Sequence, residues 1–249
     1  MSTDGISVYA IVRAGTTPPR GATGVGGPAV AVRTVRSGLV AAVVSDAPAR
    51  LRARRRDLLA HQELLMGLAE DGPVLPMRFG VIAPDEGTLR DQLATEEAGH
   101  LATLDRLAGH LEMNVKVLPA HDALGALVAA DTTVRRLREE ARRRPGYDAS
   151  VRLGEAVVAA LSRRATEAGR RMVGELTPMA RAKAEGPEVR GCALNVSFLV
   201  ERAASERFSS TVEHFAKTHR DHLEVRLAGP LPCYSFVGAR TPTALIGGG

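Results

Sequence analysis

The stretch Gly72–Val81, with the sequence GPVLPMRFGV, constrains the fold most because it places a short strand pattern between two long helical patterns. Its apolar residues recur with period two, so one face of the strand is expected to be buried and the other open. Proline donates no hydrogen bond to a sheet, and two prolines near the start therefore predict an irregular beginning or an edge position. The expected buried face holds Leu75, Met77, Phe79 and Val81, and the opposite face holds Pro76, Arg78 and Gly80.

Arg78 is expected to point away from the core of the protein. One interpretation is an ordinary surface arginine or a local ion pair, since arginine is mostly exposed in folded proteins. The other is that Arg78 marks the open face of a sheet, where a partner docks. The pattern of residues leaves both interpretations open.

The first half of the chain reads as one antiparallel sheet covered by helices. Arg36-Ser37-Gly38 separates two β-rich runs and predicts a hairpin. In the first strand Tyr9 is expected on the face opposite Ala10 and Val12, because side chains alternate along a strand. The predicted strands are 6–12, 30–35, 39–44 and 74–81, and the predicted helices are 48–69, with Pro48 in its first turn, and 85–110.

The second half of the chain predicts another sheet with longer helices. A helical pattern from Asp122 to about Met179 is interrupted at Arg144-Pro145-Gly146, and it carries many arginines. Cys233–Val237 is a short apolar run after the breaker Gly229–Pro232. The predicted strands are 112–118, 192–200 and 223–228, with a helix over 205–219.

Composition restricts the classes of function. The 249 residues carry a net charge of +5, and they contain no tryptophan and only 3% aromatic residues, so platforms for base stacking are scarce. The arginine runs are interleaved with acids, which suits solvated helix faces; acidic protein partners or weak nonspecific nucleic-acid binding are the alternatives. Two cysteines without a CxxC pair, and a beginning that lacks a signal-peptide pattern, predict reduced thiols in a cytosolic protein.

No motif for catalysis, metal binding or phosphate binding is found in the sequence. The glycine-rich stretch 15–28 lacks the Lys-Ser/Thr pair of a phosphate-binding loop and precedes a β-rich run, so a flexible or hairpin connection is expected. His100 and His110 are ten residues apart, and His219 and His222 lack further ligands at suitable spacing. We therefore expect no metal, no cofactor and no catalytic residue.

Three blocks of sequence resemble the gas vesicle protein F/L family (GvpF/GvpL). They are PVLPMRFG at 73–80, NVSFLVER at 195–202 and GPLPCYSFV at 229–237, and their order and spacing also fit. Leu231 stands where the family usually has an aromatic residue, and Cys233 where a second proline is common. The chain is similar to actinobacterial, F-like members, although these blocks do not separate the F-like from the L-like branch.

The resemblance implies an α+β protein with two domains, 1–110 and 111–249, each a modified ferredoxin-like antiparallel sheet with packed helices. The second domain would carry a helical insertion at about 122–180. The family is not catalytic, so the resemblance also implies no enzyme activity and no cofactor.

The implied function is that of an accessory or minor structural protein of gas vesicles, the protein-walled compartments that give microbes buoyancy. Its implied partners are the hydrophobic GvpA-type shell protein and other gas vesicle accessory proteins, with no specific nucleic acid and no membrane. The implied location is the vesicle shell, in the cytoplasm. Our candidate partner-binding residues are Pro76, Arg78, Phe79, Tyr234 and Phe236, and the alternative function is a small-ligand-binding or regulatory module on the same scaffold.

Overall fold

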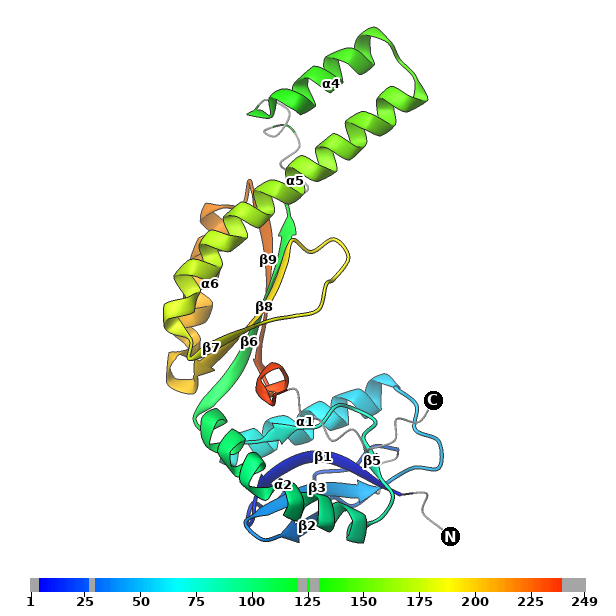
Figure 1. Ribbon diagram of the computed structural model, residues 1–249, viewed down its shortest axis with the longest axis vertical. Helices are drawn as coiled ribbons and strands as arrows, with labels where there is room; N and C mark the ends of the chain where they lie inside the picture. The colour runs from blue at the N-terminus through cyan, green and yellow to red at the C-terminus, as the bar shows by residue number, and fades with distance from the viewer. Residues whose placement is uncertain (1–4, 27–29, 121–124, 126–129, 239–249) are drawn as a thin grey trace. The chain divides into compact units, whose positions relative to one another are not determined.

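A computed structural model describes residues 5–26, 30–120, 125 and 130–238 (Figure 1). The fold is α+β, with two sheets of antiparallel strands and helices packed on them. The chain divides into two compact units, Met113–Gly229 and a second part made of Met1–Glu112 together with the chain from Pro230 onward. We call the part that contains Ile6 the first unit and Met113–Gly229 the second unit.

The division differs from the predicted domains in one respect. The predicted boundary at 110/111 falls close to the observed one after Glu112, but the predicted second domain kept the whole C-terminal segment. In the structure the segment from Pro230 onward belongs to the first unit, and both boundaries fall inside strands, β6 (His110–Pro119) and β9 (Leu223–Leu231). The predicted start of the helical insertion at 122 lies outside the described residues.

The sheet of the first unit has the strand order β2-β3-β1-β4, with β5 also paired to β1. The predicted hairpin is confirmed, because β2 and β3 pair antiparallel up to Ser37 and Val40 around Gly38, whose φ of 54° favours glycine. The predicted edge position of the proline-containing strand is also confirmed, since β4 ends the order. The strands are β1 (Ile6–Arg13), β2 (Arg33–Ser37), β3 (Val40–Asp46), β4 (Leu75–Pro76) and β5 (Ile82–Ala83).

Two helices belong to the first unit, α1 (Arg55–Asp71) and α2 (Glu86–Leu107). Helix α1 begins seven residues later than predicted, because the backbone is still extended at Arg54. Pro48 is therefore not in the first turn of α1. It packs against Gly26, where an added Cβ atom would stand 2.7 Å from the Cβ of Pro48. Asp85 caps α2 by accepting hydrogen bonds from the Thr88 backbone N–H at 2.8 Å and the Thr88 hydroxyl at 3.0 Å.

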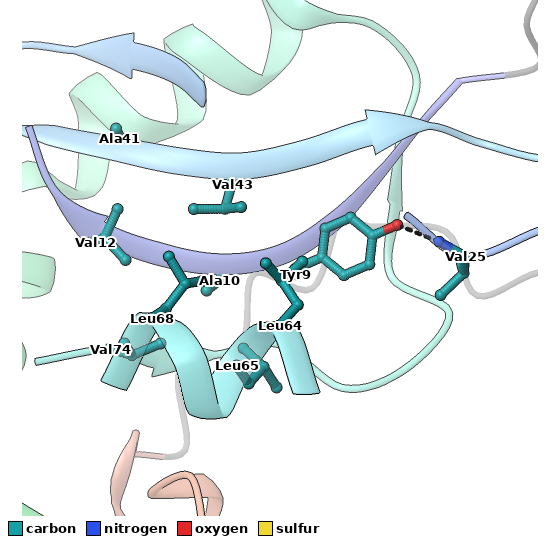
Figure 2. Packing of buried hydrophobic residues seen from close by; sticks show 10 residues of the cluster. All are labelled: Tyr9, Ala10, Val12, Val25, Ala41, Val43, Leu64, Leu65, Leu68 and Val74. Atoms are coloured by element: carbon teal, nitrogen blue, oxygen red, sulfur yellow. Dashed lines mark hydrogen bonds between the residues drawn. The ribbon is translucent and has the colours of Figure 1, made fainter. Parts of the chain in front are cut away.

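The core of the first unit lies between α1 and the sheet. Figure 2 shows side chains from α1 meeting those of β1 and β3, with the hydroxyl of Tyr9 at the edge of the cluster. Burial of these aliphatic side chains is the main favourable term for this unit. The cluster consists of Tyr9, Ala10, Val12, Val25, Ala41, Val43, Leu64, Leu65, Leu68 and Val74.

The second unit is built on a sheet with the order β7-β8-β6-β9. Strand β7 (Ala182–Glu185) is absent from the sequence prediction; it pairs antiparallel with β8 (Leu194–Glu201), although its residues are mostly exposed. The helices are α4 (Thr132–Arg143), α5 (Tyr147–Leu176) and α6 (Ser205–Thr218). Phe198 of β8 and Phe208 of α6 are fully buried, with ring centroids 5.3 Å apart.

Helix α5 is supported differently along its length. Its C-terminal half packs on the sheet, and a Cβ at Gly169 would stand 2.7 Å from Leu194 and 3.2 Å from Val117. Its N-terminal half runs beside α4, past the end of the sheet, as Figure 1 shows within this unit. A small apolar cluster around Val134 and Ala160 joins the two helices.

Candidate functional site: an aromatic surface around His61

A bulge in β1 places Tyr9 in the core. The register between β1 and β3 shifts between Val8 and Ala10, so Tyr9 is the extra residue. The prediction that Tyr9 faces away from Ala10 and Val12 is therefore wrong; it shares their cluster (Figure 2). Its hydroxyl is 2.7 Å from the Ser45 hydroxyl and accepts a 2.8 Å hydrogen bond from the Val25 backbone N–H.

The segment opposite this bulge is not one continuous strand. Strand β4 ends at Pro76, a turn follows at Phe79-Gly80, and β5 resumes the pairing with β1. The Met77 N–H donates to the Tyr9 carbonyl at 2.8 Å, and Gly80 has a φ of 89°, which an L side chain rarely adopts. The predicted strand 74–81 with strict alternation is therefore wrong: Pro76 is buried, and Phe79 is only half-buried.

His61 of α1 contacts the segment around this turn at Met77 and Phe79. Its side chain is buried, and its Nε2 is 3.0 Å from the Met77 carbonyl oxygen. Since a carbonyl only accepts hydrogen bonds, Nε2 carries the proton and donates. The ring of Phe79 meets the His61 ring edge-on with centroids 5.7 Å apart, and the Tyr9 ring lies 5.5 Å away on centroids.

The C-terminal segment reaches the same histidine. The Tyr234 hydroxyl lies 3.3 Å from His61 Nε2, although the two residues are 173 positions apart. The buried carboxylate of Glu112 accepts hydrogen bonds from the Ser235 N–H at 2.9 Å and the Ser235 hydroxyl at 2.7 Å. Arg106 donates to the Phe236 carbonyl at 2.6 Å. These three contacts fix a short 3-10 turn, Tyr234–Phe236, where the sequence predicted an undefined apolar end.

The electrostatics of the cluster favour neutral side chains. Burial lowers the pKa of His61, and the hydrogen bond to the Met77 carbonyl only partly opposes this. Burial, and then the Glu112 carboxylate, raise the pKa of Tyr234 to about 12. At neutral pH His61 is therefore uncharged and Tyr234 keeps its proton, so the pair suits positioning and apolar contact better than proton transfer.

The structure brings some of the candidate residues together and not others. Phe79 and Tyr234 both contact His61, and Tyr234 is 38% exposed. Arg78 is exposed and makes no side-chain hydrogen bond or ion pair with any residue in the described part of the chain. Pro76 and Phe236 are buried. We call Arg78, Phe79 and Tyr234, with His61 beneath them, the His61 surface.

Sequence reasoning missed His61, Glu112 and Arg106. The signal for His61 was its position on the apolar side of α1, beside Leu64, Leu65 and Leu68. The partners of Glu112 and Arg106 lie more than a hundred residues away, and no local pattern reports such contacts.

Neither a metal centre nor a membrane span is found among the residues described. No group of three or more histidine, cysteine, aspartate or glutamate side chains is arranged there to hold a metal ion. Cys192 is a free thiol, and His219 stacks on Phe215 with ring centroids 3.9 Å apart. None of the described helices has both the length and the apolar character needed to cross a bilayer.

The fold and this surface define an α+β protein of two units with an aromatic patch and no metal cluster in its described residues. The family model "Gas vesicle synthesis protein GvpL/GvpF" matches residues 5–238. The chain therefore belongs to the gas vesicle GvpL/GvpF family, as its three sequence blocks predicted.

Individual relatives agree with this assignment. The chain is 38% identical to gas vesicle protein F of Streptomyces sp. (strain CB03234), covering 92% of this chain and 98% of that protein. It is 30% identical to gas vesicle protein L of the same strain, covering 96% and 95%. The crystal structure of GvpF from Anabaena sp. PCC7120 matches with a TM-score of 0.76 at 22% identity, covering 96% of this chain and 100% of that one, which supports the fold.

Proposed function

We propose that this protein is a non-enzymatic gas vesicle accessory protein that binds the hydrophobic shell protein and supports assembly of the vesicle. A shell subunit with a water-repelling face aggregates unless another protein covers that face before assembly. Family membership supports the connection to gas vesicles. Binding to the GvpA-type shell protein, and association with the shell in the cytoplasm, are parts of the proposal.

The observation that carries the proposal is the His61 surface. Phe79 and Tyr234 come from segments far apart in sequence, yet both rest on one buried, uncharged histidine. Tyr9, Glu112 and Arg106 hold the backbone on either side, so the surface is fixed before any partner arrives. A preformed aromatic patch beside an exposed arginine binds an apolar partner with little loss of conformational entropy.

Co-expression with the shell protein tests the proposal. We expect the shell protein to stay soluble and to co-purify, including in washes above ~0.3 M salt, because an apolar contact survives screening while exposed charge contacts do not. Arg78→Glu and Tyr234→Ala should reduce the recovered shell protein, whereas Arg20→Glu, an exposed arginine elsewhere in the first unit, should not.

Two outcomes contradict the proposal. If the shell protein aggregates as it does alone, direct binding is wrong, and the small-ligand alternative becomes the better hypothesis. If recovery is lost in the high-salt wash for the unchanged protein, arginine charge alone accounts for it. Circular dichroism of each variant separates loss of binding from loss of folding.

A further inference from the structure

The N-terminal half of α5 exposes an apolar stripe. Tyr147 is 83% exposed, Val151 40% and Val158 64%, although these residues lie within about 60° of one another around the helix axis. Tyr147 and Val158 are 11 positions apart, which corresponds to roughly 16 Å along the helix axis. We call these three residues the α5 stripe.

The same side of the helix is buried further along. Ala165, Gly169, Met172 and Leu176 continue the α5 stripe with helical spacing, and all of them are buried. Gly169 lies against Leu194 and Val117 of the sheet. The α5 stripe is therefore the continuation, beyond the sheet, of a surface that is suited to packing.

The hairpin that carries this stripe is positively charged. Residues 131–164 contain nine arginines and five acidic residues, a net charge of +4 out of the chain's +5. Two of the nine arginines are paired, Arg152 with Glu140 at 3.6 Å and Arg163 with Asp131 at 3.3 Å. Six further arginines of α4 and of the turn that follows it are exposed and make no ion pair with a described residue: Arg135, Arg136, Arg138, Arg142, Arg143 and Arg144.

We propose that the α4–α5 hairpin is a docking site for an acidic amphipathic helix of another protein. The apolar face of such a helix covers the α5 stripe, and its acidic flanks meet the unpaired arginines, which form strong bidentate contacts with carboxylates. A partner helix of about three turns matches the length of the stripe. The site lies in the second unit and is independent of the His61 surface.

Other occupants fit the observations less well. A second copy of this chain would bring like charges together, because the hairpin carries +4 on each copy. Helices that bind membranes place Trp, Phe or Leu on the apolar face, whereas this stripe has one tyrosine and two valines. A nucleic acid would meet five carboxylates among the arginines and only one aromatic side chain on which a base could stack.

Peptide binding to the full-length protein tests this proposal. The probe is a fluorescent 18-residue helical peptide with leucines at i, i+3, i+4 and i+7 spacing and glutamates on its flanks; the matched probe carries lysines in their place. At ~0.15 M salt we expect the glutamate peptide to bind at least tenfold more tightly than the lysine peptide, since only the first complements the arginines.

Two sets of variants assign the binding to the hairpin. We expect the double variant Tyr147→Ser, Val151→Ser, and separately the triple variant Arg142→Gln, Arg143→Gln, Arg144→Gln, each to weaken binding about tenfold or more. The matched control is Arg52→Gln, Arg54→Gln, Arg55→Gln, which removes the same charge from exposed arginines of the first unit and should leave the affinity unchanged.

Three results would overturn the proposal. Equal weakening by the control triple variant would show that net charge, and not the hairpin, attracts the peptide. Undetectable binding of the glutamate peptide would remove the helix as occupant. Tighter, hairpin-dependent binding to phosphatidylserine vesicles or to a 20-base-pair DNA duplex would replace it with a membrane or a nucleic acid.

Discussion

The His61 surface and the α4–α5 hairpin both expose apolar side chains, but they are supported in opposite ways. At the His61 surface the Tyr234 hydroxyl lies against a buried histidine, which is itself hydrogen-bonded to the Met77 carbonyl. Glu112 and Arg106 hold the turn that carries Tyr234 by hydrogen bonds to Ser235 and Phe236. On the hairpin the exposed residues stand on two helices that share only a small apolar cluster. The first surface is therefore coupled to the stability of its unit, while the second can change with little effect on folding.

The largest expected difference concerns the core beneath the His61 surface. Leu65→Ala should lower the free energy of unfolding of the first unit by about 2–5 kcal/mol, because the side chain is fully buried and its loss leaves a cavity. Amide hydrogen exchange resolved by residue should show faster exchange in β1 and β3, with β8 unchanged. An equal increase in β8 would mean that the two units unfold together.

The next effect concerns the anchor of the C-terminal turn. Glu112→Ala removes both hydrogen bonds to Ser235 and should cost about 1.5–3 kcal/mol, the usual range for hydrogen bonds to a charged group. Limited proteolysis should then cut near Tyr234 faster than in the unchanged protein. Glu63→Ala, an exposed acid on α1, is the control and should leave the cleavage rate as it was.

A smaller effect should follow from pH. The folded-state pKa of His61 lies below its ordinary value of 6.5, so the unfolded chain binds a proton that the folded one does not as the pH falls below about 6.5. The stability due to neutral His61 is complete above that pH and is lost below it. Thermal unfolding between pH 7.5 and 5 should show this decline.

His61→Gln should reduce the pH dependence of the first unit without abolishing it. His100, also in this unit, has a pKa lowered by burial and contributes in the same direction. If the stability of His61→Gln and of the unchanged protein falls in the same way with pH, protonation of His61 does not contribute to that loss. His214→Gln, in the second unit, is the matched control.

The smallest effect is expected on the hairpin. Val158→Ala should change the free energy of unfolding by less than about 0.5 kcal/mol, since 64% of the side chain is already exposed. Chemical denaturation followed through the second unit measures this. A loss comparable to that of Leu65→Ala would show that the stripe is covered within the protein, and the contrast between the two surfaces would fail.

Sequence patterns predicted the elements with strong local signals. Gly38 defined the hairpin between β2 and β3, and two prolines placed the strand before Met77 at a sheet edge. Strand β7 was missed because Ala182–Glu185 alternates alanine with charged residues and contains no β-branched side chain. Local periodicity also could not show the bulge at Tyr9, since one extra residue reverses the alternation that the prediction assumed.

The family blocks contained part of the His61 surface, and its role in partner binding stays a prediction. The family blocks contained Phe79 and Tyr234, and the structure places both against His61. The blocks did not distinguish side chains at the surface from those beneath it, so Pro76 and Phe236 were chosen as contact residues although both are buried. Burial depends on long-range packing, which the spacing of residues within a motif does not report.

The division of the chain has a consequence for how the protein is made. The first unit includes both the beginning of the chain and the segment from Pro230 onward, with the whole of Met113–Gly229 between them. At about 5–20 residues per second, a ribosome needs on the order of ten seconds to translate that intervening part. During this interval Tyr234 and Ser235 have not yet been synthesised, so His61 and Glu112 lack their hydrogen bonds to these two residues. Synthesis of the segment from Pro230 onward is therefore needed to complete the first unit, and a chain that is cut short before Pro230 has a complete second unit and an incomplete first one.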